Sequence, residues 1–224
     1  MGHEQEDSLL TGILLHKMRK ILKYGSFLLA VAVAAGILAG CSKKAVEVES
    51  LPQYDTEVAE GEQIAVMTIR DYGTIKIRFF KEQAPKAVEN FITHAKQGYY
   101  NELNFHRVIE NFMIQGGDPE GTGRGGSDET IKGEFSENGV KNDISHERGV
   151  ISMARSSDPD SASSQFFIVQ SDSTYLDGQY AAFGHVTEGM DIVDQICKDA
   201  KPTDNNGTIS ADEQPVMTSV TIID

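Results

Sequence analysis

The sequence is poor in cysteine and has no excess of positive charge. The first argues against a disulfide and a cysteine-based metal site, and the second against nucleic-acid binding. It has 20 Lys and Arg residues against 34 Asp and Glu residues, a formal net charge of −14 at pH 7. Proteins that bind nucleic acids present a basic surface to the phosphate backbone, so this composition excludes that class. Residues 1–40 hold four Lys and Arg and three Asp and Glu, which leaves 16 and 31 in the remainder, a net charge of −15. The acidity therefore belongs to the part of the chain that follows residue 40.

The two cysteines, Cys41 and Cys197, do not form a pair that makes structural sense. A disulfide would join the end of an export segment to a helix near the C-terminus. Neither cysteine has a neighbour at the spacing of a metal site. Because Cys197 ends the largely apolar stretch 192–197, we expect it to be a small buried side chain; a reactive thiol is the alternative.

Motifs of hydrolysis and of metal binding are also missing. No serine lies in a G-x-S-x-G turn, and no histidines are spaced as in H-x-x-x-H or H-E-x-x-H. We therefore predict no metal and no other cofactor. His106 lies between Phe105 and Arg107, and we expect it to be a hydrogen-bonded structural residue.

Two loops match part of a ligand-binding motif, one for phosphate and one for calcium. Residues 121–126 (Gly-Thr-Gly-Arg-Gly-Gly) lack the ending and the following helix of a phosphate-binding loop, so we expect a tight surface loop. Residues 204–207 (Asp-Asn-Asn-Gly), followed by Glu213, partly fit a calcium loop, but Pro202 occupies its first ligand position. An acidic surface turn is the prediction there, and a calcium site is the alternative.

The N-terminal segment has the pattern of a secretory signal. Basic residues at positions 17, 19, 20 and 23 precede an apolar run over residues 27–39. The run is short and rich in Ala and Gly, which does not favour a permanent membrane span. We predict a signal peptide over residues 1–40, although residues 1–17 are long and polar for its basic region and Met18 would be a more typical start.

The end of this segment, Leu-Ala-Gly-Cys at residues 38–41, resembles a bacterial lipobox. That resemblance implies lipidation of Cys41, which would become the first mature residue on the outer side of a bacterial cell membrane. An ordinary cleaved signal and an uncleaved anchor are the alternatives. Residues 41–61 show little periodicity and are predicted to be a flexible tether, which would hold a soluble domain near the membrane.

Residues 62–224 are predicted to form one domain that is mainly β. Alternating apolar residues on both sides of a turn at 71–73 indicate a β-hairpin. Helical spacing predicts one helix from Pro85 to Gly98 and a second over 189–197. Further strands are expected over residues 149–154, 165–169, 181–186 and 216–223. Many short strands with two helices favour a closed or nearly closed antiparallel barrel whose ends the helices cap.

One stretch, residues 105–118, contains most of the candidate functional side chains. Two strand-like pieces that meet at a turn over Glu110 and Asn111 would bring Arg107 beside Phe112, Met113 and Gln115. This predicts an apolar pocket with one cation and one amide at its rim.

The same stretch resembles a cyclophilin. The matching blocks run in order along residues 64–223: Phe-His-Arg-Val-Ile, Phe-Met-Ile-Gln-Gly-Gly-Asp, Gly-Thr-Gly, Gly-Val-Ile-Ser-Met-Ala, Ser-Gln-Phe-Phe-Ile, Leu-Asp-Gly and Phe-Gly-His-Val-Thr-Glu-Gly-Met-Asp. The resemblance implies a peptidyl-prolyl cis–trans isomerase on an eight-stranded antiparallel barrel capped by two α-helices.

The resemblance also implies roles for residues at matching positions. Arg107 matches the catalytic arginine, with Gln115 and Phe112 beside it. Substrate contacts are implied for the pocket walls and for polar or backbone groups, at Met113, Ala154, Gln165, Phe167 and Leu176. Substrate contacts are implied for three further positions, which depart from the commoner family residues: Arg155 replaces an asparagine, Tyr175 a tryptophan and Tyr180 a histidine. The change at Tyr175 predicts weak binding of the inhibitor cyclosporin.

The chemistry fits these residue types. Rotation about an X-Pro amide crosses a barrier of about 18–20 kcal/mol but breaks no bond, so it requires neither a nucleophile nor a metal. A guanidinium could stabilise the twisted amide while apolar side chains grip the ring. We expect a monomer that acts on proline-containing segments of exported proteins. The alternative is a proline-peptide-binding module or holdase with little turnover.

Overall fold

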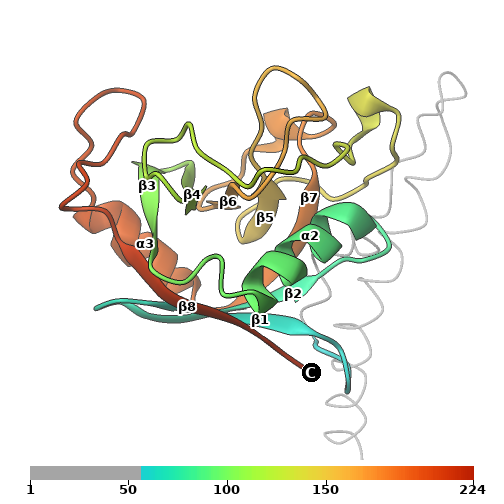
Figure 1. The fold of residues 1–224 in the computed structure, drawn as a ribbon, viewed down its shortest axis with the longest axis horizontal. Helices are drawn as coiled ribbons and strands as arrows, with labels where there is room; N and C mark the ends of the chain where they lie inside the picture. The colour runs from blue at the N-terminus through green and yellow to red at the C-terminus, as the bar shows by residue number, and fades with distance from the viewer. Residues whose placement is uncertain (1–56) are drawn as a thin grey trace, which may run out of the picture. The chain divides into compact units, whose positions relative to one another are not determined.

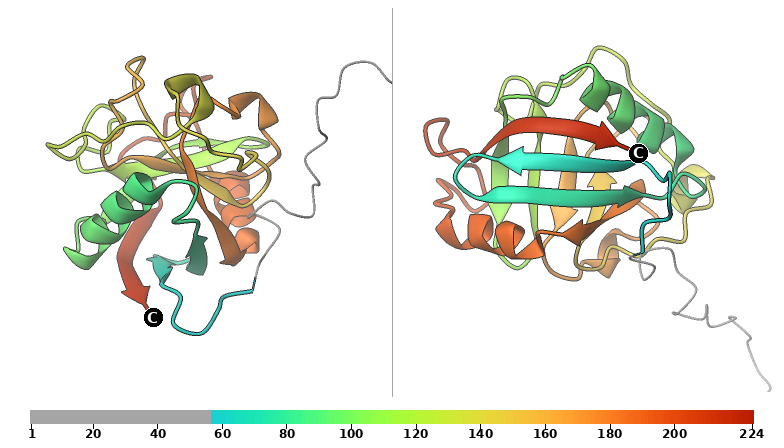
Figure 2. Two further views of the ribbon diagram at one scale, coloured as in Figure 1. Left: turned by 90° about the vertical axis from the view of Figure 1, so that its right-hand side faces the viewer. Right: turned by 90° about the horizontal axis from the view of Figure 1, so that it is seen from below.

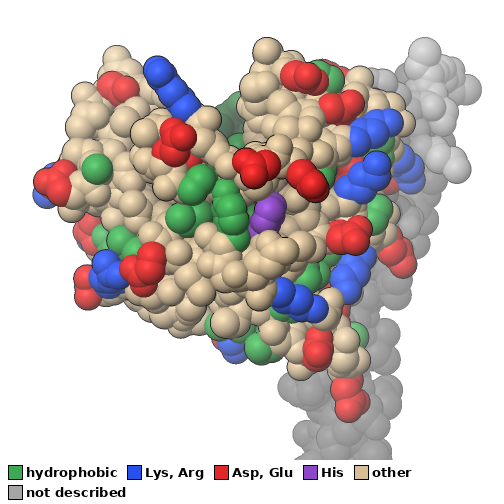
Figure 3. All heavy atoms as spheres, in the orientation of Figure 1, with side chains coloured by type: hydrophobic (Ala, Val, Ile, Leu, Met, Phe, Trp, Pro, Cys, Tyr) green, Lys and Arg blue, Asp and Glu red, His purple; other side chains and the backbone are tan. Residues whose placement is uncertain are grey.

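The computed structural model describes residues 57–224. The predicted signal peptide, Cys41 and most of the tether lie outside the described residues. Within the described part, no helix has the length and apolarity needed to cross a bilayer. Acidic side chains are scattered over the face in Figure 3, with Lys and Arg between them, and do not gather in one patch.

Eight strands form a closed antiparallel barrel (Figure 1), which confirms the predicted fold class. Around the barrel their order is β1, β2, β7, β5, β6, β4, β3 and β8, and β8 closes on β1. Their bounds are β1 Ile64–Ile69, β2 Gly73–Phe79, β3 Leu103–Ile109, β4 Met113–Asp118, β5 Val150–Met153, β6 Phe166–Val169, β7 Ala182–Glu188 and β8 Val216–Ile223. A closed barrel leaves no unpaired edge strand.

The first hairpin shows how the sequence pattern fills the barrel. Alternate residues of β1 and β2 are buried, and those in between are half-buried or exposed. Asp71 turns the chain between the two strands with φ of 64°. Since side chains alternate across a strand, the period-2 pattern directs one set into the core, as predicted.

Two helices, α2 (Pro85–Lys96) and α3 (Met190–Asp199), lie on opposite sides of the barrel (Figure 2). Phe91 of α2 is fully buried, with ring centroids 4.9 Å from Tyr100, 5.4 Å from Phe166 and 5.5 Å from Phe183. These aromatic contacts join α2 to the barrel interior. Two short 3-10 helices, η3 (Ser136–Asn138) and η4 (Thr174–Leu176), interrupt the loops.

Cys197 on α3 is 4% exposed, which confirms that it is a buried side chain. Burial raises the pKa of its thiol to about 12, so the nucleophilic thiolate is nearly absent at neutral pH.

The start of α2 is capped by a side chain from a distant loop. Ala84, the N-cap residue, offers no side-chain acceptor. Glu134, which is 4% exposed, accepts hydrogen bonds from the N–H groups of Lys86 (3.0 Å) and Ala87 (2.9 Å). A carboxylate there satisfies two free donors and complements the positive end of the helix dipole.

We therefore expect Glu134→Ala to lower the free energy of unfolding by about 1–3 kcal/mol, because one buried and one part-buried N–H group would lose their acceptor. Urea denaturation followed by circular dichroism would measure the change. Glu137→Ala removes an exposed carboxylate from the same loop and should alter stability by less than about 0.5 kcal/mol. Equal effects of the two substitutions would contradict the capping role.

Candidate active site

The register of the barrel places the predicted chemistry in one row. Arg107 on β3 pairs with Gln115 on β4, Gln115 pairs with Phe167 on β6, and Phe167 pairs with Ser152 on β5. Residues directly opposite each other in paired strands lie on the same face of a sheet. An arginine, an amide and an aromatic ring from three strands are therefore neighbours on one face.

Arg107 is held on both sides. Its Nε donates to the carbonyl oxygen of Asn206 (2.7 Å), and its Nη1 donates to Oε1 of Gln115 (3.1 Å). Nη1 also lies 3.9 Å from the sulfur of Met113, and the guanidinium carbon lies 5.9 Å from the centre of the Phe112 ring. Partial burial lowers the pKa of Arg107, but an arginine still carries its charge at neutral pH. The structure thus provides a fixed cation.

The polar groups continue as a directed chain of hydrogen bonds. Nε2 of Gln115 donates to Oε1 of Gln165 (2.9 Å), and Nε2 of Gln165 donates to the carbonyl oxygen of Gly125 (2.7 Å). Each amide therefore accepts from one neighbour and donates to the next, which fixes both in one orientation.

Beside this chain lies a cavity of about 150 Å³, here called the apolar pocket. Its lining brings together nine of the eleven predicted contact residues: Arg107, Phe112, Met113, Gln115, Ala154, Arg155, Phe167, Leu176 and Tyr180. Gln165 lines an adjoining hollow, and Tyr175 is 64% exposed with its ring 6.0 Å from that of Phe112. The predicted set forms one site with Tyr175 at its outer rim.

Phe167 is supported from below by a chain of three side chains that the sequence motifs did not suggest. Nε2 of His146 lies 3.0 Å from Oγ of Ser152, and Nδ1 lies 2.9 Å from Oδ1 of Asp177. The His146 ring stacks on Phe167 at 6.0 Å and 17°. These groups have the order of a hydrolytic triad, but Ser152 is 0% exposed and cannot reach a substrate. They support the Phe167 ring, which lines the pocket.

The loop over residues 203–209 takes part in the site, which sequence reasoning missed. Val108 donates its N–H to the carbonyl of Gly207 (2.9 Å), and Ile209 donates to the carbonyl of His106 (3.0 Å). The loop thereby runs beside β3 and brings the carbonyl of Asn206 to Arg107. A signal was present in the Asn-Gly turn, but nothing in the sequence indicated which strand the turn would meet.

Asp204 stabilises this loop internally. Its carboxylate accepts from the N–H groups of Asn206 (2.9 Å) and Thr208 (3.0 Å) and from the Thr208 hydroxyl (2.9 Å). These contacts describe the predicted acidic turn. Within residues 57–224, no three His, Cys, Asp or Glu side chains are grouped to hold a metal.

The prediction that His106 is hydrogen-bonded is wrong. Its side chain is 4% exposed, and neither ring nitrogen has a partner. An irregularity in the β3–β4 register beside it leaves both Phe105 and His106 buried. His106 lies beneath the loop at Gly123, where the nearest amides already donate to Asp118. Burial lowers the pKa of His106, which favours a neutral packing residue.

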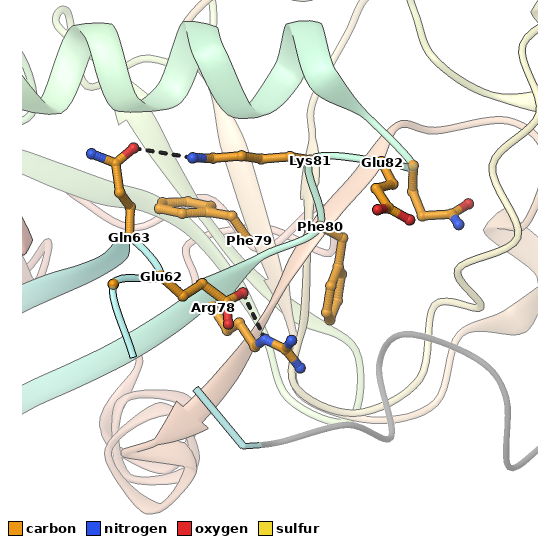
Figure 4. A pocket seen from close by; sticks show the side chains of 9 residues that line it. Glu62, Gln63, Arg78, Phe79, Phe80, Lys81 and Glu82 are labelled. Carbon is orange, nitrogen blue, oxygen red and sulfur yellow. Dashed lines mark hydrogen bonds and ion pairs between the residues drawn. The ribbon is translucent and has the colours of Figure 1, made fainter. Parts of the chain in front are cut away.

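A larger hollow of about 370 Å³ lies elsewhere, beside the end of β2 (Figure 4). Both of its cations are already engaged: Nε of Arg78 contacts Glu62 at 2.8 Å, and Lys81 donates to Gln63 at 3.1 Å. Size alone therefore does not identify the site, and the chemistry favours the smaller apolar pocket.

Comparisons with known proteins agree on one family. The model for the cyclophilin type peptidyl-prolyl cis-trans isomerase/CLD family matches residues 64–224. A peptidyl-prolyl cis-trans isomerase of Helicobacter pylori is 44% identical over 146 residues, which cover 64% of this chain and 87% of that protein. The isomerase cyp15 of Rhizopus delemar is 47% identical over 146 residues, 62% of this chain but only 23% of that longer protein.

Comparison with solved structures gives the same family. The crystal structure of a cyclophilin type peptidyl-prolyl cis-trans isomerase from Cryptosporidium parvum, in the presence of the dipeptide Ala-Pro, superposes with a TM-score of 0.63 at 31% identity. The match covers 72% of this chain and 99% of that one.

The contact between the 203–209 loop and Arg107 can be tested at Gly207. This residue has φ of 85°, and an added Cβ would press on the Ile109 side chain and lie 2.7 Å from the carbonyl oxygen of Val108. We expect Gly207→Ala to push the loop away from β3 and release Arg107. In ¹⁵N-edited NMR spectra, the Arg107 Nε–H signal should shift and exchange faster with water.

Gly139→Ala is the matched control, because Gly139 has φ of 75° and open space around an added Cβ. Both substitutions carry a left-handed backbone cost of about 1–2 kcal/mol. An unchanged Arg107 signal in Gly207→Ala, or an equal change in both variants, would contradict the positioning role of the loop.

Proposed function

The chain belongs to the cyclophilin-type peptidyl-prolyl cis–trans isomerases, and we propose that it isomerises X-Pro bonds of exported proteins outside the cytoplasm. The observation that carries the proposal is Arg107, fixed by the Asn206 carbonyl and Gln115 at the rim of the apolar pocket. The enzyme class follows from the family, whereas the residue roles and the cellular setting are our assignments.

Catalysis of this reaction requires the protein to stabilise the twisted state of the X-Pro amide bond. An amide twists when its nitrogen lone pair leaves conjugation with the carbonyl, against a barrier of about 18–20 kcal/mol. Groups that bind the twisted amide more tightly than the planar one lower this barrier, by a factor of ten for each ~1.4 kcal/mol.

Arg107 is placed for that task. Its Nε and Nη1 groups donate to protein acceptors, and its Nη2 group has no partner among the described residues. We assign Nη2 to the prolyl nitrogen, whose lone pair becomes a hydrogen-bond acceptor as the amide twists. Because the guanidinium is already oriented, it would not need to reorganise during the reaction.

The apolar pocket would bind the pyrrolidine ring of the proline. Met113 is 1% exposed and Phe167 is 5% exposed, so both present rigid apolar surfaces, and Phe112 and Leu176 complete the walls. A pyrrolidine ring held there would stay fixed while the preceding carbonyl turns. We assign the second Nε2 hydrogen of Gln115 and the backbone of Ala154 to the peptide chain of the substrate.

The cellular setting rests on the N-terminal sequence. The lipobox-like residues 38–41 and the export signal before them support attachment through a lipid on Cys41. We propose that the protein works as a monomer at the outer side of a bacterial cell membrane, where unfolded exported chains arrive with X-Pro bonds in both isomers.

We expect Arg107→Ala to lower kcat/KM for a short X-Pro peptide by about 100-fold or more, as for removal of one preorganised donor. A protease-coupled assay or NMR exchange spectroscopy would measure it. Arg107→Lys should also be slow, because an ammonium cannot reproduce the fork that bonds Asn206 and Gln115. If peptide bound normally while wild type and Arg107→Ala were equally slow, the protein would be a proline-binding module or holdase.

For the anchor, cells fed a radioactive fatty acid should label the wild-type chain, and Cys41→Ser should lose the label. Cys197→Ala is the control, since Cys197 is buried and should not affect labelling. An unlabelled wild type would refute the lipid anchor and leave the enzyme assignment intact.

A further inference from the structure

The six arginines of the described chain fall into two groups. Three form ion pairs with carboxylates: Arg70 with Glu102, Arg78 with Glu62 and Arg148 with Asp194. Three form none within residues 57–224: Arg107, Arg124 and Arg155. In a chain with 34 acidic residues, three unpaired arginines are unexpected, and all three line two adjoining hollows.

The second of these hollows, here called the polar pocket, holds about 320 Å³ and shares Gln115, Ala154 and Arg155 with the apolar pocket. A peptide whose proline fills one pocket would therefore pass over the other. Besides Arg124 and Arg155, the polar pocket is lined by glycines, by Gln165 and by the serines at 127, 156, 161 and 163. Its lining has two cations and no carboxylate, and three of its four serine hydroxyls already donate to protein acceptors.

Arg155 is fixed in this position. Its Nε donates to the carbonyl of Gln179 (2.9 Å) and its Nη1 to the carbonyl of Ser156 (2.8 Å). The guanidinium carbon lies 5.0 Å from the Phe135 ring centre and 4.8 Å from the Tyr180 ring centre. Neutral carbonyls and rings orient the group without cancelling its charge, so a bound anion would meet a cation that is already in place.

Two carboxylates near the polar pocket, those of Asp118 and Asp158, accept hydrogen bonds from backbone N–H groups. Asp118 accepts from the N–H groups of Glu120, Thr122 and Gly123, which lower its pKa although burial alone would raise it. Asp158 accepts from the N–H of Asp160. These acids stabilise the two loops that border the pocket, and neither forms an ion pair with Arg124 or Arg155.

We propose that the polar pocket binds an acidic side chain of the substrate, an Asp or Glu within a few residues of the proline. This preference rests on the proposed isomerase function and adds a substrate class to it. A carboxylate would accept hydrogen bonds from the guanidinium groups of Arg124 and Arg155, and a lysine in its place would be repelled.

The test uses the mature chain, from Cys41 to Asp224, and a set of X-Pro peptides. Each peptide carries Glu, Gln or Lys at one position between three residues before and two residues after the proline. Assays at about 0.15 M ionic strength screen the long-range repulsion from the acidic protein. At one or two positions we expect kcat/KM for Glu to exceed that for Gln by about 3- to 10-fold, with Lys lower than Gln.

The same Glu-to-Gln ratio identifies the residues responsible. It should fall toward one in Arg124→Gln and Arg155→Gln and reach one in the double variant. Arg70→Gln is the matched control, since Arg70 is exposed and paired with Glu102, and it should keep the wild-type ratio. The ratio is the readout because Arg155→Gln also disturbs the packing of Tyr180, which would change the rates for all peptides alike.

Peptide dissociation constants separate this proposal from the proposed function. If no peptide is isomerised, the enzyme assignment fails, and the Glu-to-Gln ratio of dissociation constants still decides whether the pocket prefers acids. A wild-type ratio near one at every position, in both turnover and binding, would overturn the proposal. So would a ratio that survives in the Arg124→Gln, Arg155→Gln double variant.

Discussion

The hydrogen bond from Nε of Arg107 to the Asn206 carbonyl joins two parts of the chain that are 99 residues apart. It exists because the 203–209 loop pairs with β3, and that pairing exists because Gly207 can approach Val108 without a side chain. Closure of the barrel fixes β3 against β4, and therefore fixes Arg107 against Gln115. The orientation of one guanidinium thus depends on both the sheet register and a loop that closes beside it.

The sequence could predict those features that one segment encodes. Alternation in the first hairpin, the helical spacing after Pro85 and the turn at Asn111 each depend on neighbours a few residues away. The strand pair around that turn predicted that Arg107, Met113 and Gln115 share a surface, since a short connection leaves little choice of partner. Resemblance to a family extended the set to Phe167 and Leu176, on separate segments.

Features that depend on contacts between distant segments were not predictable in this way. Nothing near Glu134 indicates that its carboxylate caps α2, because the loop that carries it has no regular pattern. His106 was expected to be hydrogen-bonded because it is a polar residue beside a functional one. A local irregularity of the sheet placed it instead under a loop whose donors serve Asp118. Both outcomes were decided by which segments meet, which periodicity does not specify.

Two of the departures from commoner family residues, Arg155 and Tyr180, are in contact with each other. Arg155 and Tyr180 replace an asparagine and a histidine in the pattern that the sequence resembles, and the structure brings their side chains to 4.8 Å. A tyrosine ring stabilises an adjacent guanidinium through its face, where a positively charged histidine would repel it. An arginine at 155 therefore favours an aromatic partner at 180. The pair adds a second cation to the lining of the apolar pocket, and this cation is held by carbonyl oxygens and aromatic rings and not by a carboxylate. Arg107 and Arg155 both line the apolar pocket, so a bound carboxylate would meet two cations there, and this supports the proposed preference for an acidic side chain even though the protein is acidic overall.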